Sequence, residues 1–170
     1  MAVMFLTATP VKAAPVAGFT SYCADALTSA HKDEKEEKAA DEKAAKKAAA
    51  QKEQRQQDID LLAHAIWNET GILGDTAMYY TGSVILNRIA SDIYPDDLYS
   101  VIYQPGQYAI TWTGMINRPA PERAYEIAGE LLENGSILPS GYLFQAEFCQ
   151  CENHNHIVIG NTYFCRRLHE

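Results

Sequence analysis

Lysine is absent from most of this 170-residue sequence, because none occurs after Lys52. The segment 31–58 carries eight basic and eight acidic residues, so the net charge of −8 lies entirely outside it. Nucleic-acid binding needs a basic face that displaces counterions from phosphates. The acidic balance of the remaining chain disfavours such a face, and we expect no nucleic-acid partner.

Long hydrophobic runs are also missing. No apolar stretch approaches the roughly 20 residues that a membrane-spanning helix requires, so we expect no integral membrane segment. The first residues, MAVMFLTATPVKAAPVAG, combine an apolar stretch with small residues, as a secretory leader does, but they lack a basic start and contain Lys12. We therefore interpret residues 1–29 as a leader or a disordered N-terminal segment.

Branched apolar residues are absent between Leu27 and Ile59, and residues 30–57 contain neither glycine nor proline. The Ala, Lys, Glu and Gln that fill this stretch favour helix, and Glu34–Lys38 and Glu42–Lys46 are stabilising i,i+4 pairs. Without an apolar seam, a coiled coil is not expected. We interpret residues 30–57 as an Ala/Lys/Glu-rich helical spacer, with a frayed polar linker as the alternative.

The compact part should begin near Asp58 and run to residue 170. A buried helical face is indicated by apolar residues at i, i+3, i+4 and i+7, namely Ile59, Leu62, Ala63 and Ile66. A second stripe comprises Met78, Gly82, Ile85, Leu86 and Ile89, where the glycine indicates close helix–helix contact. A helix should follow near Leu98–Ile102, and another should have Pro121 as its first residue. Strand-like runs cover Tyr142–Phe148 and Ile157–Cys165. This order, helices first and a small hairpin last, indicates an α+β fold.

The helix boundaries have recognisable signals. We expect Gly71 to follow the end of the first helix, Asp75 or Thr76 to cap the second, and Asp96 to cap the third. Pro105-Gly106 should form a tight turn. Asn87 should be buried and should tie its helix to a loop through amide hydrogen bonds.

Glu69 is the candidate catalytic residue. It lies at the edge of the stripe formed by Leu62 and Ile66, at the negative end of the helix dipole. Partial burial and the dipole both raise the pKa of a carboxyl group, and a protonated carboxyl can act as a general acid. The alternative is an ordinary exposed glutamate at a helix end.

Five ordered segments resemble the SleB-type cell wall hydrolases, which include spore-cortex-lytic enzymes. They read A-I-W-N-E-T-G (65–71), S-V-I-L-N-R (83–88), V-I-Y-Q-P-G-Q-Y (101–108), S-G-Y-L-F (140–144) and I-G-N-T-Y-F-C (159–165). The resemblance makes Glu69 the catalytic acid. It also implies a mostly helical, lysozyme/transglycosylase-like domain over 58–170, with a small C-terminal β-hairpin and a long charged single helix before it.

This resemblance implies cleavage of peptidoglycan between N-acetylmuramic acid and N-acetylglucosamine. A lytic transglycosylase can use one Glu, which protonates the leaving oxygen and then accepts the proton of the muramyl C6 hydroxyl. Many members read E-A-R-G-E, whereas this chain has Glu69-Thr70-Gly71-Ile72-Leu73, so the Arg and the second Glu are missing. Asp75 and Glu147 are minor candidates for a second carboxylate in true hydrolysis.

Substrate contacts are expected from residues in two of the matching segments: Gln104, Gln107, Tyr108 and Asn161. Amide groups suit the N-acetyl groups of the sugars, and a tyrosine ring suits a sugar face. Tyr108 can equally be a core residue. For Trp112 we expect a position in the core.

The cysteines form a separate cluster with histidines, since Cys149, Cys151, His154, His156 and Cys165 lie close in sequence. The preferred interpretation is a disulfide from Cys149 or Cys151 to Cys165, because an exported protein favours one. Free thiols come second and a zinc site third, since Cys149-x-Cys151 is tighter than the usual C-x₂₋₄-C. We therefore expect no metal and no cofactor.

The sequence thus predicts a secreted or cell-surface enzyme, possibly spore-associated, that acts on peptidoglycan glycan strands. A groove beside Glu69 should hold the glycan. The alternatives are a hydrolytic muramidase, a zinc-dependent hydrolase built on the Cys/His cluster, and a non-catalytic wall-binding module.

Overall fold

The computed structural model describes the backbone of residues 20–151 and 155–167, and side chains from Lys38 onward within these ranges. The expected leader, Cys23 and His154 therefore lie wholly or partly outside the described residues. The chain divides between Ala49 and Ala50 into two compact units.

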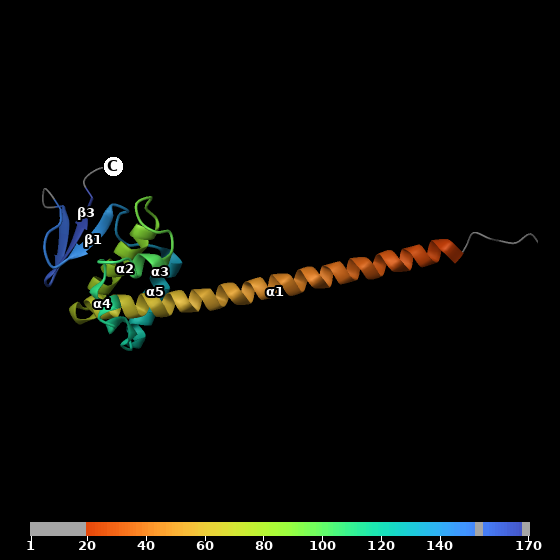
Figure 1. Ribbon diagram of the computed structural model, residues 1–170, viewed down its shortest axis with the longest axis horizontal. Helices are drawn as coiled ribbons and strands as arrows, with labels where there is room; N and C mark the ends of the chain where they lie inside the picture. The colour runs from red at the N-terminus through yellow and green to blue at the C-terminus, as the bar shows by residue number, and fades with distance from the viewer. Residues whose placement is uncertain (1–19, 152–154, 168–170) are drawn as a thin grey trace, which may run out of the picture. The chain divides into compact units, whose positions relative to one another are not determined.

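The secondary-structure elements follow one another along the chain as Figure 1 shows. In order, they are α1 (Thr20–Thr70), η1 (Gly71–Leu73), α2 (Asp75–Ile89), α3 (Leu98–Ile102), α4 (Ala109–Trp112), η2 (Met115–Asn117), α5 (Glu122–Asn134), β1 (Tyr142–Ala146), β2 (His156–Ile159) and β3 (Thr162–Arg166).

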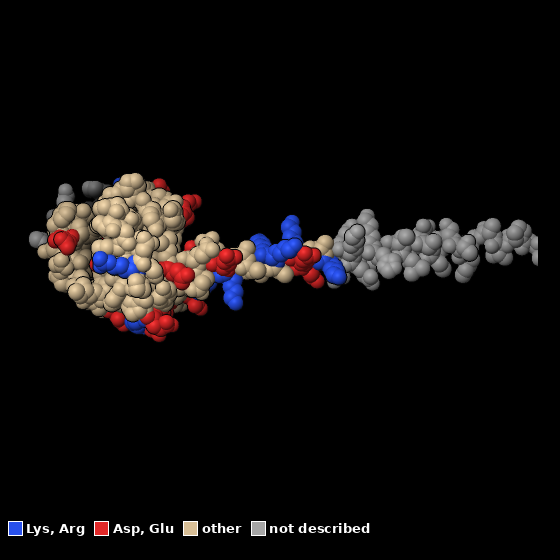
Figure 2. Space-filling view, turned by 60° about the horizontal axis from the view of Figure 1, so that its bottom comes forward, with Lys and Arg blue, Asp and Glu red and all other residues tan. Residues whose placement is uncertain are grey.

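Helix α1 confirms the long charged helix that the composition predicts. Every described side chain from Lys38 to Gln57 is exposed, and Figure 2 shows acidic and basic side chains mixed along this stretch. Lys46 Nζ lies 2.7 Å from Glu42 Oε1, so the second of the expected i,i+4 pairs forms. Such exposed pairs contribute only a few tenths of a kcal/mol, about 0.3–0.5 each.

The hydrophobic core lies where the last turns of α1 meet α2, α3 and α5. The expected stripe of α1 is buried: Leu62, Ala63 and Ile66 are fully inaccessible to solvent, and Ile59 packs against the core from its margin. Gly82 of α2 has the predicted role, because a Cβ there would lie 2.4 Å from Leu131 Cδ1 of α5. The two helices therefore approach more closely than any larger residue would permit.

One boundary prediction is confirmed and two are wrong in detail. Gly71 directly follows the end of α1, as predicted, and its lack of a side chain serves contact with Trp67, since a Cβ would lie 2.1 Å from Trp67 Cε3. The left-handed residue is Gly74 (φ 91°), which precedes α2, so neither Asp75 nor Thr76 caps that helix. Asp97, not Asp96, caps α3 by accepting a hydrogen bond from the Ser100 backbone N–H at 2.8 Å.

The predicted turn at Pro105-Gly106 forms, with Gly106 at φ 80° and a hydrogen bond from Gln107 N to Gln104 O of 3.1 Å. Pro121 occupies the position before α5 and not its first residue. Asn87 is buried, and its amide donates to the carbonyl oxygens of Pro139 (2.8 Å) and Tyr142 (3.1 Å), as predicted.

The C-terminal region is an antiparallel sheet of three strands in the order β1-β3-β2. The run predicted as one strand, Ile157–Cys165, is itself a hairpin that turns at Gly160-Asn161, where Gly160 has φ 60°. The α+β class is confirmed, with one strand more than the sequence indicated. Phe164 of the central strand β3 is fully buried and packs on Val84 of α2, which joins the sheet to the helices.

Candidate active site

Glu69 is the penultimate residue of α1, and its neighbours hold the end of that helix in place. Thr70 is buried, and its hydroxyl lies 2.7 Å from the Thr81 hydroxyl of α2. On the other side, Asn68 Nδ2 donates to the carbonyl of His64 at 2.8 Å. His64 in turn contacts the Ile116 carbonyl (2.8 Å) and the Tyr125 hydroxyl (3.0 Å). The backbone that carries the carboxylate is therefore fixed from two directions.

Burial raises the pKa of Glu69 above its ordinary value of 4.5, and a backbone hydrogen bond with Ile110 of α4 opposes that rise in pKa. Its Oε1 atom is buried and has no hydrogen-bond partner among the described residues. A half-buried carboxyl with one unpaired oxygen retains its proton to higher pH than an exposed one. The electrostatic environment expected for a general acid is thus present at Glu69.

Tyr108 lies close enough to Glu69 for that carboxyl to act on its hydroxyl, and Arg88 packs against the Tyr108 ring. The Tyr108 ring is buried, and burial raises the pKa of its hydroxyl to about 12, with the charge of Arg88 opposing that shift and the charge of Glu69 adding to it. The guanidinium carbon of Arg88 lies 5.2 Å from the Tyr108 ring centre and 5.0 Å from that of Tyr94. Arg88 Nε donates to the Leu143 carbonyl at 2.8 Å, so the sheet orients this cation.

Five buried side-chain atoms lack hydrogen-bond partners among the described residues, and three of them belong to Glu69, Arg88 and Tyr108. They are Glu69 Oε1, Arg88 Nη1, Gln104 Oε1, Tyr108 Oη and Gln145 Oε1. Unpaired buried polar atoms are uncommon in folded proteins, because each costs about 1–3 kcal/mol. Glu69 Oε1 and Tyr108 Oη belong to side chains that interact electrostatically, and unpaired buried atoms of this kind suit a polar ligand or ordered water. Sequence reasoning missed Arg88 as a site residue, although it ends the segment S-V-I-L-N-R.

The four predicted substrate-binding residues differ from one another in burial. Gln104 is half-buried and Tyr108 is buried, whereas Gln107 is exposed after the tight turn. Asn161 is exposed in the turn between β2 and β3, where its amide donates to Glu147 Oε1 at 3.2 Å. That turn lies beside η1, because a Cβ on Gly160 would lie 2.7 Å from Leu73 Cδ2.

The expected core position of Trp112 is wrong. Its side chain is 62% exposed at the end of α4, the same short helix whose Ile110 backbone contacts Glu69. An exposed indole offers a flat apolar face for a sugar ring. Trp112 is therefore a further candidate for substrate contact, and its position on a four-residue helix explains why helical periodicity gave no signal for it.

The two candidates for a second carboxylate are engaged elsewhere. Asp75 lies in the first turn of α2 and accepts a hydrogen bond from Arg123 Nε at 2.8 Å, and Glu147 accepts the bond from Asn161. Both are exposed. Among the described residues, no other carboxylate contributes to the pKa shift of Glu69.

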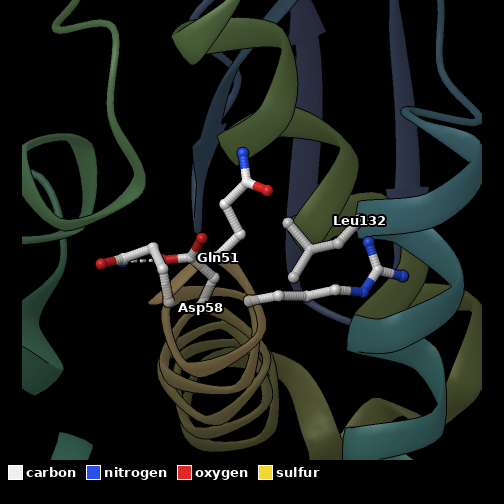
Figure 3. A pocket seen from close by; sticks show the side chains of 5 residues that line it. Gln51, Asp58 and Leu132 are labelled. Atoms are coloured by element: carbon white, nitrogen blue, oxygen red, sulfur yellow. Dashed lines mark hydrogen bonds between the residues drawn. The ribbon is translucent and has the colours of Figure 1, made fainter. Parts of the chain in front are cut away.

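Two shallow cavities lie away from Glu69. One, of about 260 Å³, lies between α1 and α5, and Figure 3 shows Leu132 forming one wall opposite the Asp58 carboxylate. The other, of about 280 Å³, is lined by residues of α1 together with Tyr103, Ile116 and Asn117. Glu69 lines neither cavity, so the groove expected beside it stays a prediction.

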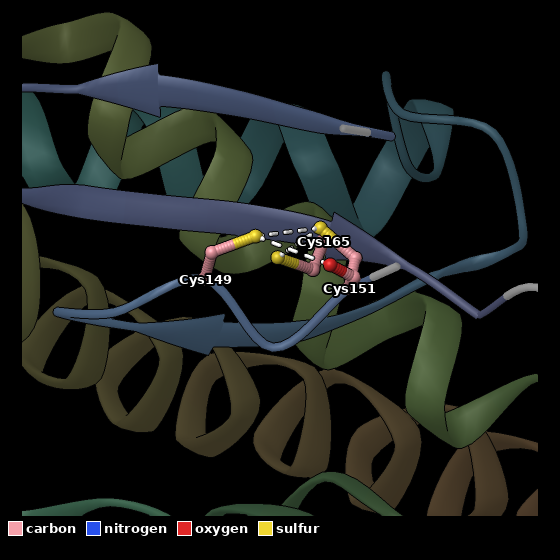
Figure 4. A group of neighbouring side chains, drawn as sticks. All are labelled: Cys149, Cys151 and Cys165. Atoms are coloured by element: carbon pink, nitrogen blue, oxygen red, sulfur yellow. Dashed lines mark hydrogen bonds between the residues drawn. The ribbon is translucent and has the colours of Figure 1, made fainter. Parts of the chain in front are cut away.

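The thiols of Cys149, Cys151 and Cys165 are brought together, as Figure 4 shows. The Cys151 and Cys165 sulfurs are 2.8 Å apart, longer than the 2.03–2.05 Å of a disulfide, and all three cysteines are free thiols. The expected pairing partners are therefore adjacent, but no disulfide is present among the described residues.

Comparison with solved structures assigns the fold. The catalytic domain of Bacillus cereus SleB superposes with a TM-score of 0.56 at 23% identity, over 65% of this chain and 91% of that one. The catalytic domain of a germination-specific lytic transglycosylase, Bacillus anthracis SleB, gives 0.52 at 22% identity, over 65% and 95%. No curated protein matches the chain.

The family follows from the sequence itself. The family model described as Cell Wall Hydrolase matches residues 74–165, more than half of the chain. The protein belongs to this family of peptidoglycan-cleaving enzymes, which act on the wall outside the cytoplasmic membrane. The matched range begins after Glu69, so the family match does not include that residue. Among the described residues, no helix is long and apolar enough to cross a bilayer.

Proposed function

We propose that the protein is a lytic transglycosylase that cleaves the bond between N-acetylmuramic acid and N-acetylglucosamine, with Glu69 as its only acid/base. The observation that carries the proposal is the half-buried Glu69 carboxyl, whose pKa is raised by burial and whose Oε1 has no hydrogen-bond partner in the described part of the chain. The similar structure from Bacillus anthracis is the catalytic domain of a germination-specific lytic transglycosylase, which agrees with the proposal.

In the first step, the protonated Glu69 carboxyl donates its proton to the glycosidic oxygen, and the bond from that oxygen to muramyl C1 breaks. The N-acetyl oxygen of the sugar stabilises the positive charge that develops at C1. The Glu69 carboxylate then accepts the proton of the muramyl C6 hydroxyl, and O6 forms a bond to C1. The products are a 1,6-anhydro sugar and a free hydroxyl, and no water is consumed.

The exposed face of Trp112 and the unpaired hydroxyl of Tyr108 are proposed to contact the glycan, together with Gln104, Gln107 and Asn161. Trp112 lies two residues after Ile110, whose backbone contacts Glu69. A sugar ring stacked on Trp112 would therefore contact α4, the same short helix whose Ile110 backbone contacts Glu69. Each unpaired polar atom near Glu69 would gain a partner from the hydroxyl or N-acetyl groups of the substrate.

We also propose that the protein is exported and that residues 30–57 act as a spacer before a catalytic domain of residues 58–170. The support is the peptidoglycan substrate of the family and the full exposure of the described side chains between Lys38 and Gln57. Spore cortex and vegetative wall are both substrates to be compared.

Product analysis tests the reaction. Purified protein is incubated with defined peptidoglycan, and the muropeptides are identified by mass spectrometry. We expect 1,6-anhydro products, which are lighter than hydrolytic products by one water molecule. Reducing ends would instead indicate a muramidase, and pelleting with sacculi without product would indicate a wall-binding module.

The variant Glu69→Gln removes the proton donor while keeping the side-chain volume. We expect product release to fall by about 10²–10⁴-fold, the usual contribution of general acid–base catalysis. The matched control is Glu122→Gln, which alters an exposed glutamate in the first turn of α5. Full activity of the Glu69 variant would refute the assignment of the acid.

A further inference from the structure

The outer side of the C-terminal sheet gathers three thiols and an imidazole. Cys165 lies on β3 opposite His156 of β2, and cross-strand partners project on the same face. Its neighbour Phe164 projects to the other face, into the core with α2. Cys149 and Cys151 approach Cys165 from the segment that follows β1 (Figure 4).

The three thiols converge, and the imidazole of His156 approaches one of them, Cys149. Cys149 Sγ lies 3.3 Å from Cys151 Sγ, and Cys151 Sγ lies 2.8 Å from Cys165 Sγ. Cys149 Sγ is also 3.6 Å from His156 Nδ1. The three sulfur atoms all lie within 4.8 Å of one another. The four side chains therefore come from three places in the chain: the segment after β1, strand β2 and strand β3.

Hydrophobic burial does not hold residues 149–151 against the sheet. Their sequence is Cys-Gln-Cys, with no apolar side chain except the cysteines. Phe148, just before it, is 64% exposed. Yet Cys165 beneath it is only 1% exposed. A chemical link between the cysteines would explain why such a polar segment covers this position.

We propose that Cys149, Cys151, Cys165 and His156 bind one Zn²⁺ ion in a closed tetrahedral site. With Zn–S bonds of about 2.3 Å and a Zn–N bond of about 2.0–2.1 Å, neighbouring sulfurs are about 3.8 Å apart and sulfur and nitrogen about 3.6 Å apart. The Cys149–His156 separation of 3.6 Å already equals such an edge. The Cys151–Cys165 separation of 2.8 Å must widen by about 1 Å, and the Cys149–Cys151 separation of 3.3 Å by about 0.5 Å, when the ion binds.

The short spacing Cys149-x-Cys151 would argue against a zinc site if all four ligands had to come from one stretch of the sequence. Here the fold supplies them, since β2 contributes His156 and β3 contributes Cys165. A disulfide between Cys151 and Cys165 would use two of the four groups. It would leave the Cys149 thiol 3.3 Å from the bond, where thiol–disulfide exchange would compete with it.

Four protein ligands leave no open position for water, so this site is structural and performs no hydrolysis. It would join the segment after β1 to β2 and β3. The turn of the β2–β3 hairpin contacts Leu73 in η1, shortly after Glu69. The ion would thus stabilise the part of the domain that lies beside the candidate active site. The proposal does not depend on the chemistry assigned to Glu69.

Metal analysis of the full chain tests the proposal. The protein is purified with a reductant and zinc, dialysed, and analysed for bound metal and free thiols. We expect one zinc per chain and, after exchange with Co²⁺, the intense visible bands of tetrahedral cobalt with thiolate ligands. A metal-free protein whose mass is lower by two hydrogens and whose peptide map links Cys151 to Cys165 would overturn it.

Ligand variants separate the two outcomes further. Cys149→Ser and His156→Gln should each weaken Co²⁺ binding by more than the roughly 10–100-fold that loss of an outer-shell partner costs. The control Cys23→Ser, which removes the fourth cysteine of the chain, should leave the cobalt spectrum unchanged. Cobalt binding that survives both Cys149→Ser and His156→Gln would contradict the four-ligand set, because each variant removes one of the four proposed ligands. Cobalt binding can be measured on the native protein even if Cys165→Ser fails to fold.

Discussion

The hydroxyl groups of Thr70 and Thr81 lie 2.7 Å apart in the fully buried interface between the end of α1 and α2. Thr70 Oγ1 also donates to the Ile66 carbonyl at 3.2 Å, so Thr81 supplies the proton between the two hydroxyls. This bond fixes the residue next to Glu69 without any charged group. The position of the candidate acid therefore depends on a neutral contact between two helices.

The two threonines should differ in their contribution to stability. Thr70→Val leaves the Thr81 hydroxyl buried without a partner and should lower the free energy of unfolding by about 1–3 kcal/mol. Thr81→Val leaves Thr70 bonded to the Ile66 carbonyl and should cost about 0.5–1.5 kcal/mol. Urea unfolding of both variants and of the double variant measures the difference. Equal costs would show that the inferred donor is wrong.

Stability should depend on pH through Glu69. Burial raises its pKa above 4.5, so the folded state holds the proton more tightly than the unfolded state. The stability from this group is complete below the unfolded pKa and is lost as pH rises through the folded pKa. We expect the wild type to lose stability relative to Glu69→Gln across that window, with a constant difference above it. Unfolding free energies at a series of pH values provide the measurement.

Activity should fall as the pH rises through the pKa of Glu69 in the folded protein, because the acid must hold its proton in the first step. If the stability difference between wild type and Glu69→Gln were independent of pH, the carboxyl would titrate like an exposed one. The enzymatic interpretation of its burial would then fail.

The contact between α2 and α5 should tolerate no side chain at Gly82. Gly82→Ala places a Cβ 2.4 Å from Leu131 Cδ1 and should cost about 1–3 kcal/mol through overpacking. Gly129 is the matched control within α5, because no atom lies within 4 Å of its added Cβ. Gly129→Ala should raise stability by about 0.5–1 kcal/mol through helix propensity. Thermal unfolding that gave both variants the same sign would contradict this account.

Trp112 should contribute to substrate binding and little to folding. Its side chain is 62% exposed, so Trp112→Ala should change the unfolding midpoint only slightly while raising the KM for soluble glycan fragments. Tyr99, also 62% exposed, provides the control for loss of a surface aromatic ring. A large stability loss with unchanged KM would return Trp112 to a packing role.

The sequence was informative where periodicity spans several turns. The buried stripe of α1 and the glycine contact of α2 could be predicted because Leu62, Ile66 and Gly82 lie in long amphipathic patterns. Trp112 could not, because α4 has too few residues for a pattern. Gly160-Asn161 is a recognisable hairpin signal, but the apolar residues on both sides of it favoured the prediction of one continuous strand.

The candidate site shows a similar division. Glu69 was predicted from its place at the end of an apolar stripe, and its raised pKa agrees with that placement. The contacts of Arg88 with Tyr94 and Tyr108 join three separate segments, and only the folded chain reveals them. The approach of Cys149 and Cys151 to Cys165 likewise depends on strand order, which linear spacing does not encode.

The position of β3 between β1 and β2 sets a limit on how far the chain can be shortened. A fragment ending at Ile159 would keep Glu69 and every helix among the described residues, but it would leave both remaining strands without a pairing partner. It would also remove Phe164, the largest fully buried side chain, and leave a void against Val84. Catalytic fragments prepared for crystallisation should therefore retain the chain through at least Arg166.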